Sequence, residues 1–212
     1  MTQPKEKTLS LQQTMLRAAG LLSLFVVISV GLLIAVNSFT KPKIAEAEQQ
    51  ALLAMINQVM PAEHYNNDLL ADSKTLIAPE HLGTETPVKI YRARLNGEPA
   101  GLVIETIAPN GYSGNIYLLV GVFADGRVSG VRVLRHRETP GLGDKIELRK
   151  DNWILSFDGR SYTTENASRW AVKRDRGDFD QFTGATITPR AVVGAVARTL
   201  DYVNQQGASL YD

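Results

Sequence analysis

One long hydrocarbon run near the N-terminus dominates the hydropathy pattern. Residues 18–40 contain no charged side chain, and the stretches 21–28 and 32–36 are almost entirely apolar. About 20 apolar residues cross the hydrocarbon core of a bilayer. A cleavable signal peptide usually has a shorter apolar region that ends at small residues, and residues 37–42 offer no such cleavage site. The pattern therefore predicts a retained transmembrane helix over residues 18–40.

Basic residues flank this predicted helix unequally. Three precede it and two follow it: Lys5, Lys7 and Arg17, then Lys41 and Lys43. Because positive charge is enriched on the cytoplasmic side of a membrane, the balance favours a cytoplasmic tail at residues 1–17. The bulk of the chain is then expected on the extracytoplasmic, or periplasmic, side.

The next segment has helical periodicity on one face. Apolar side chains recur between Leu52 and Met60, acidic and amide side chains occupy the other side, and Pro61 ends the pattern. We expect this helix to pack on its own domain; the alternative is a helix that faces the membrane surface or a partner. Residues 61–87 are polar and mixed, so residues 41–87 together are predicted to form a helical linker and an irregular connection.

From residue 88 the apolar pattern changes to a period of two. Three hairpin-like units follow, with turns at Asn96-Gly97, Asp125-Gly126 and Asp158-Gly159. The strands predicted around these turns are residues 88–95 and 100–107, 116–124 and 128–134, and 153–157 and 161–164. A helical pattern then runs to Gln206. Hairpins followed by a helix predict an α+β domain at residues 88–212, with a mainly antiparallel sheet and flanking helices.

Composition removes several classes of function. The 23 basic and 22 acidic residues nearly balance and form no basic cluster, which argues against a nucleic-acid partner. The absence of cysteine excludes an iron–sulfur cluster or a thiolate metal site built from this chain alone. The 3 histidines lie far apart, without the spacing of a metal site, and no acid–base pair suggests a catalytic residue.

Residues 180–189, Asp-Gln-Phe-Thr-Gly-Ala-Thr-Ile-Thr-Pro, carry the strongest local signal. They place three threonine hydroxyls around Gly184 and Ala185, immediately before the C-terminal helical pattern. Pro189 suits a first helical turn and Thr188 suits the N-cap position. Because the N-terminus of a helix presents unpaired N–H groups, it favours an anion such as phosphate. The turn chemistry gives Thr188 a capping role but leaves Thr183 and Thr186 equivalent.

Two further segments add glycine-rich loops. Glu-Thr-Pro-Gly-Leu-Gly at residues 138–143 follows a predicted strand, where Gly141 and Gly143 allow backbone N–H groups to face a ligand. Gly-Tyr-Ser-Gly at residues 111–114 precedes the strand at residues 116–124.

These segments resemble a known family. D-x-x-T-G-A-T at residues 180–186 is similar to the acceptor motif of the bacterial flavin transferase, which joins FMN to a threonine through its phosphate. E-T-P-G-L-G is the second hallmark of the same FMN-binding domain. That domain is shared by the G subunit of the Rnf electron-transport complex and the C subunit of the sodium-pumping NADH:quinone reductase. The resemblance covers roughly residues 88–202 and the N-terminal span.

The resemblance implies covalent FMN on Thr186. The other cofactor-binding residues that it implies are Thr183, Gly184, Ala185, Thr188, Glu138, Thr139, Gly141, Leu142, Gly143, Tyr112 and Ser113. Tyr112, Leu142 and Trp153 are candidates for stacking against the flavin ring, although each also suits a hydrophobic core.

The function implied is that of a membrane-anchored flavoprotein subunit of an Rnf-type ion-translocating complex in the bacterial inner membrane. Its partners would be the other subunits and, during maturation, the flavin transferase. One alternative is a component of the quinone reductase that resembles its C subunit, which the short chain disfavours. The other is a membrane-anchored binding module without redox chemistry.

Overall fold

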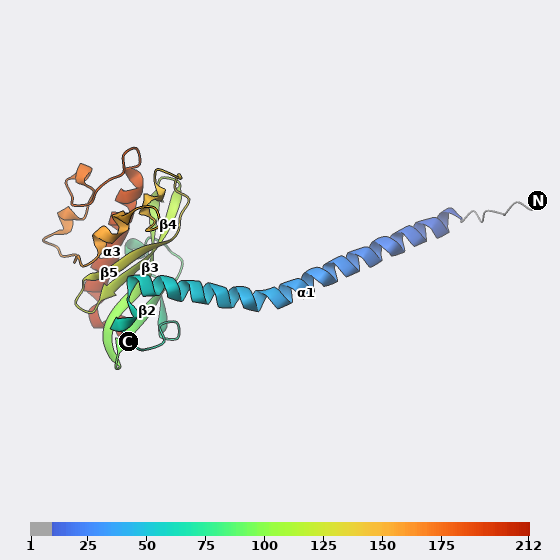
Figure 1. Ribbon diagram of the computed structural model, residues 1–212, viewed down its shortest axis with the longest axis horizontal. Coiled ribbons are helices and arrows are strands. Elements are labelled where there is room, and N and C mark those ends of the chain that lie inside the picture. The colour runs from blue at the N-terminus through green and yellow to red at the C-terminus, as the bar shows by residue number, and fades with distance from the viewer. Residues whose placement is uncertain (1–9) are drawn as a thin grey trace, which may run out of the picture. The chain divides into compact units, whose positions relative to one another are not determined.

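The computed structural model describes residues 10–212, and the chain divides into two compact units, Met1–Ala51 and Leu52–Asp212. Helix α1, Leu11–Val59, contributes residues to both units (Figure 1). The first nine residues of the predicted tail, with Lys5 and Lys7, lie outside the described residues.

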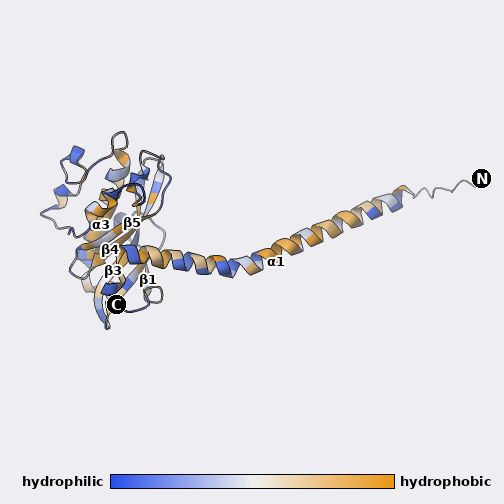
Figure 2. Ribbon diagram, viewed as in Figure 1, coloured by the Kyte–Doolittle hydropathy of each residue, from blue (hydrophilic) through white to orange (hydrophobic). Residues whose placement is uncertain are grey.

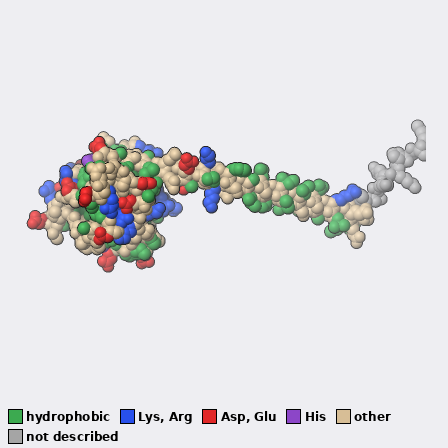
Figure 3. Space-filling model, turned by 90° about the horizontal axis from the view of Figure 1, so that it is seen from below, with side chains coloured by type: hydrophobic (Ala, Val, Ile, Leu, Met, Phe, Trp, Pro, Cys, Tyr) green, Lys and Arg blue, Asp and Glu red, His purple; other side chains and the backbone are tan. Residues whose placement is uncertain are grey.

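The apolar part of α1 has the exposure of a membrane span. Leu21, Phe25 and Leu33 are 70%, 67% and 69% exposed. The apolar stretch is continuous in Figure 2, and Lys and Arg side chains stand at both of its ends in Figure 3. Because these apolar side chains are not covered by protein, they suit contact with lipid. The helix continues through Pro42, so the span and the amphipathic segment form one helix.

The second unit contains a five-stranded antiparallel sheet in the order β1-β2-β3-β4-β5, which confirms the predicted α+β fold class. The strands are β1 Ser73–Leu76, β2 Val88–Leu95, β3 Glu98–Gly111, β4 Gly114–Phe123 and β5 Val128–Arg135. Two of the predicted hairpins are confirmed. Asn96 and Gly97 have φ values of 55° and 88°, the left-handed geometry of a tight hairpin turn, and Gly126 has a φ of 84°.

The third predicted hairpin is wrong. Residues Asn152–Phe157 form a 3₁₀ helix, η3, and Ser161 joins the sheet region through an isolated bridge to Arg127. The buried residues of η3 are Trp153, Ile154 and Phe157, and this spacing points them to one side of a helix instead of alternating across a strand.

The segment expected to be an irregular connection also contains regular structure. It forms β1, which pairs with β2, and the short helix α2, Pro79–Leu82. The remaining helices are α3 Ile187–Gln206 and the 3₁₀ segments η1 Ala62–His64, η2 Asp144–Ile146, η4 Ala167–Arg169, η5 Lys173–Asp175 and η6 Gly207–Tyr211.

Two hydrophobic clusters cover opposite faces of the sheet. Leu118 and Val120 of β4 belong to the cluster that includes Val192 and Val196 of α3. Leu119, between them, belongs to the cluster that includes Ile56 and Val59 at the end of α1. Because successive strand residues point to opposite faces, β4 contributes to both layers. Its burial on both faces explains why its sequence is almost continuously apolar.

The last turn of α1 packs on a glycine step in the sheet. A Cβ atom on Gly121 would lie 2.6 Å from the carbonyl oxygen of Val59, and one on Gly130 would lie 2.9 Å from its Cα atom. The Ser129 hydroxyl donates to the same Val59 carbonyl. The two glycines therefore allow the helix backbone to contact the sheet directly.

We predict that Gly121→Ala lowers the free energy of unfolding of the second unit by about 1–3 kcal/mol, because the added methyl group overpacks this contact. Thermal denaturation of the full chain in detergent measures the change. Gly194→Ala in α3 is the control, since its Cβ would meet only the end of the Arg198 side chain, at 3.4 Å. That variant should keep or slightly increase stability, and equal losses in both variants would contradict the packing argument.

Candidate functional site

Three segments that are distant in sequence meet around a cavity of about 490 Å³. They are the β3–β4 turn, the loop after β5 and the turn before α3. Nine of the residues singled out from the sequence line it: Tyr112, Glu138, Thr139, Leu142, Gly143, Gly184, Ala185, Thr186 and Thr188. The other three, Ser113, Thr183 and Gly141, adjoin lining residues in the chain but do not line the cavity themselves. Arg174 and Ile187 line it and were not predicted.

The Glu138 carboxylate connects the three segments. Its side chain is buried, with 4% of the residue exposed. One carboxylate oxygen accepts a hydrogen bond from the backbone N–H of Ser113 at 3.0 Å, and the other accepts one from the Thr188 hydroxyl. The Glu138 N–H donates to His136 Nδ1 at 2.9 Å, which fixes the loop after β5. A buried carboxylate requires such partners because its desolvation is costly.

Glycine at two positions makes room for this carboxylate. A Cβ atom on Gly143 would lie 2.9 Å from the Glu138 Cβ and 3.0 Å from the Thr188 hydroxyl. A Cβ atom on Gly111 would lie 2.9 Å from a carboxylate oxygen of Glu138. Both contacts are closer than side chains tolerate, so the glycines of the two loops serve close packing around Glu138.

The threonine-rich turn presents its three hydroxyls differently. Gly184 has a φ of 79°, and the Ala185 N–H donates to the Phe182 carbonyl at 3.0 Å, which closes the turn. Thr183 is exposed, and Thr186 is half-buried at the N-cap position of α3, where its side chain makes no capping hydrogen bond.

The expectation that Thr188 caps the helix is wrong. Helix α3 begins at Ile187, so Thr188 lies within the first turn and is only 1% exposed. Its hydroxyl donates to Glu138 instead of capping the helix, because a hydrogen bond to a buried carboxylate is stronger than one between neutral groups.

Arg174 is held beside the cavity by a neighbouring ion pair. Arg190, in the first turns of α3, donates to both carboxylate oxygens of Asp175, at 2.6 and 2.9 Å. These hydrogen bonds hold the pKa of Asp175 below its ordinary value. The Arg174 N–H also donates to Gln181 Oε1 at 3.2 Å. No local sequence signal could identify Arg174, because its position depends on a pair 15 residues apart.

The exposed apolar residues at the cavity suit a planar ring. Tyr112 is 68% exposed, and Leu142 and Ile187 are each 45% exposed. Trp153, by contrast, is 8% exposed, and its indole N–H donates to the Asp180 carbonyl at 2.7 Å, so it belongs to the core. The cavity therefore combines an apolar rim, one arginine, a helix N-terminus and a threonine hydroxyl that does not cap the helix. This set fits a flavin ring and its phosphate.

We predict that Glu138→Ala destabilises the second unit by about 1–3 kcal/mol, because the Ser113 N–H and the Thr188 hydroxyl lose their acceptor. Amide exchange at Ser113, followed by NMR, should accelerate in the same variant. Glu138→Gln retains an oxygen acceptor in a side chain of similar size, and should lose less stability. Slower or unchanged exchange at Ser113 in Glu138→Ala would contradict the assigned contact.

Comparison with known proteins identifies the domain that contains this cavity. The FMN-binding domain model matches residues 111–201, and the RnfG N-terminal region model matches residues 1–59. The G subunit of the ion-translocating oxidoreductase complex of Vibrio atlanticus is 51% identical over 189 residues, which cover 89% of this chain and 90% of the relative. The proteins of the same name from Vibrio cholerae and Shewanella baltica are 48% and 47% identical, over 94% and 95% of this chain and 95% of each relative. The chain therefore belongs to the family of G subunits of the Rnf ion-translocating oxidoreductase complex and contains the FMN-binding domain of that family.

Proposed function

We propose that this chain is the membrane-anchored flavoprotein subunit of an Rnf-type complex and that FMN is attached to Thr186 through a phosphoester. The observation that carries the proposal is the position of Thr186. Thr186 lines the same cavity as Arg174, at the start of α3, and its side chain makes no capping hydrogen bond.

The other two threonines of the turn are poorer acceptors. The Thr188 hydroxyl is buried and donates to Glu138, so an incoming phosphoryl group would have to displace a core contact. Thr183 is exposed and does not line the cavity. Of the three, Thr186 combines access with a position inside the site.

The charge around Thr186 supports a phosphate. Arg174 contributes a permanent positive charge, and the first N–H groups of α3 contribute the positive end of the helix dipole. A phosphodiester at this point would keep one negative charge. Thr186 would supply the ester oxygen, while Arg174 and the helix N-terminus would stabilise the remaining charge.

The apolar residues of the cavity would position the ring. Tyr112, Leu142 and Ile187 are exposed and line the cavity, so they would contact the faces or edge of a flat aromatic group. Bound FMN would supply the one- and two-electron redox chemistry. Covalent attachment would make the occupancy of the cavity independent of the concentration of free FMN, because geometry sets the local concentration of a tethered group.

The anchor and the partners follow from the family. We infer that residues 18–40 span the bacterial inner membrane, with the second unit on the periplasmic side, and that the chain assembles with the other subunits of the complex. A flavin transferase would attach the cofactor during maturation. The relatives, each named as the G subunit of such a complex, favour the Rnf complex over the quinone reductase. A binding module without redox chemistry would be flavin-free when isolated from its native membrane.

We predict that Thr186→Val abolishes covalent flavin. Wild-type protein expressed with the flavin transferase should remain fluorescent on a denaturing gel, because the ester survives unfolding. Thr164→Val, at an exposed threonine outside the acceptor motif and the cavity lining, is the matched control and should keep the signal. Fluorescence that persists in Thr186→Val would remove the assignment to this residue.

We further predict that Arg174→Ala slows flavin attachment roughly tenfold or more, since it removes a charge-assisted contact to the phosphate. The measurement is the time course of flavin incorporation with purified transferase. Arg176→Ala, on the same loop but outside the cavity lining, should react at the wild-type rate. Equal rates for the two variants would exclude a role for Arg174.

A further inference from the structure

A second cavity, of about 520 Å³, lies along the outer edge of β5. As the last strand of the sheet, β5 pairs with β4 on one side. Its outer edge is occupied at the start, where the Val128 N–H donates to the Arg160 carbonyl and the Val128 carbonyl accepts from Gly159. Within the described part of the chain, no such backbone bonds join residues 129–135 to a segment outside the sheet. This part of the edge can therefore accept another strand.

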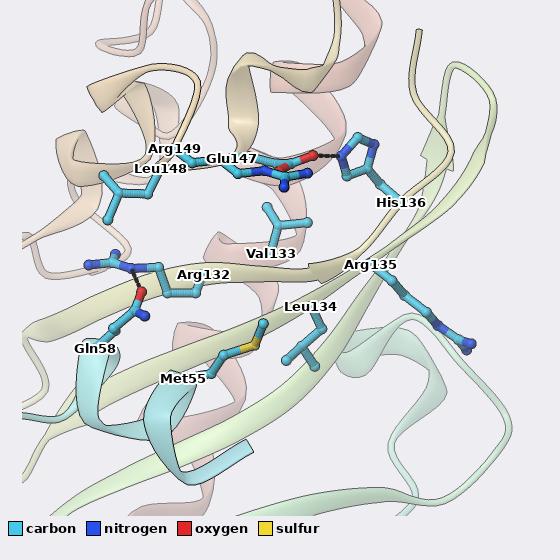
Figure 4. Close-up of a pocket in the computed structure, with 10 residues that line it drawn as sticks. All are labelled: Met55, Gln58, Arg132, Val133, Leu134, Arg135, His136, Glu147, Leu148 and Arg149. Carbon is cyan, nitrogen blue, oxygen red and sulfur yellow. Dashed lines mark hydrogen bonds and ion pairs between the residues drawn. The ribbon is translucent and has the colours of Figure 1, made fainter. Parts of the chain in front are cut away.

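Apolar side chains form a wall on each side of this edge. Figure 4 shows Val133 and Leu134 on opposite sides of β5, Val133 on the same side as Leu148 and Leu134 on the same side as Met55. Val133 and Leu148 pack against the α3 cluster, whereas Leu134 and Met55 pack against the α1 cluster. An extended segment in this groove would place its alternate side chains against these two walls, as strand geometry requires.

Positive charge dominates the lining of the groove. The lining contains three arginines, Arg132, Arg135 and Arg149, and one glutamate, Glu147. Glu147 is already occupied, because it accepts from Arg149 and from His136, and its pKa is lowered by these contacts, chiefly by Arg149.

The arginines differ in how firmly they are held. Arg132 donates to Gln58 Oε1 at 3.1 Å. Its partial burial lowers the pKa of the guanidinium, and the negative charge of Asp158 opposes this effect. The Arg149 side chain is 76% exposed, and Arg135 stacks over the Tyr117 ring at 3.7 Å. Exposed arginines of this kind select an acidic partner and set its orientation more than they set raw affinity.

We propose that this groove binds an extended acidic segment of a neighbouring subunit, which adds to the sheet as a strand beside residues 132–135 of β5. The backbone edge would provide affinity, the two apolar walls would receive alternate side chains, and the arginines would select acidic residues at the ends of the segment. This interface lies outside the cavity that contains Thr186 and does not depend on flavin attachment.

Hydrogen exchange on the full chain tests the proposal. The chain is compared in two states, alone in detergent and within the complex extracted from its native membrane. Amides of residues 132–135 that point to the outer edge should exchange about tenfold more slowly, or slower still, in the complex, because a new strand bonds them. Unchanged exchange at these outward-pointing amides, or protection restricted to the surrounding loops, would overturn strand addition.

Charge reversal tests the chemistry of the partner. Arg135→Glu combined with Arg149→Glu should remove the protection and release the chain from the complex at lower salt. Lys74→Glu combined with Lys89→Glu changes the net charge equally on exposed residues of β1 and β2, at the other end of the sheet, and should leave both properties unchanged. Equal effects of the two pairs would overturn the assignment to β5.

Two further measurements distinguish the proposed segment from other possible occupants of the groove. Protection of residues 132–135 by vesicles of anionic lipid, without the other subunits, would assign the groove to the membrane surface and overturn the proposal. Protection that rises with the concentration of the chain alone would assign it to a second copy, with the same consequence. Flavin content at Thr186 is recorded in each sample, so that failure of this proposal is distinguishable from failure of the cofactor assignment.

Discussion

The cofactor site depends on one buried carboxylate. Glu138 accepts hydrogen bonds from the β3–β4 turn and from the first turn of α3, while its own backbone N–H is bound by His136. A carboxylate that is almost fully buried is tolerated only when its oxygens are satisfied, so each segment restrains the other two. Gly111 and Gly143 have no Cβ because one would collide with this group. The glycine-rich loops therefore provide close packing first, and their backbone reaches the cavity as a consequence.

The predictable parts of the structure are those governed by local chemistry. Asn96-Gly97 predicts its hairpin because few other residue pairs adopt two left-handed conformations in succession. The hydrocarbon run predicts a helix because its length matches the thickness of a bilayer, but the pattern does not show that α1 extends through Pro42 to Val59 as one helix. The segment at residues 153–157 resembles a strand because a short apolar run has no distinctive period. The pattern around Thr188 suggests a cap because Glu138, 50 residues earlier, is not visible to a local pattern. Arg174 could not be predicted for the same reason, because its position depends on contacts between distant residues.

Anchoring and tethering serve a common purpose. A membrane span in α1 would restrict the protein to a membrane plane, and an ester on Thr186 would restrict the flavin to one position on the protein. Both restrictions replace binding equilibria by fixed geometry, which raises the effective concentration of the carrier near its partners. An electron carrier benefits because transfer then requires only the approach of neighbouring subunits. The open edge of β5 offers one route by which such a neighbour is held at a defined orientation.

The central claim is that Thr186 carries the nucleotide. Peptide mapping by mass spectrometry, on protein extracted from the native membrane with its complex intact, tests it most directly. We expect the peptide containing residues 180–190 to carry the mass of an FMN phosphoester, and fragmentation to place that mass on Thr186. An unmodified Thr186 in that sample would contradict the claim.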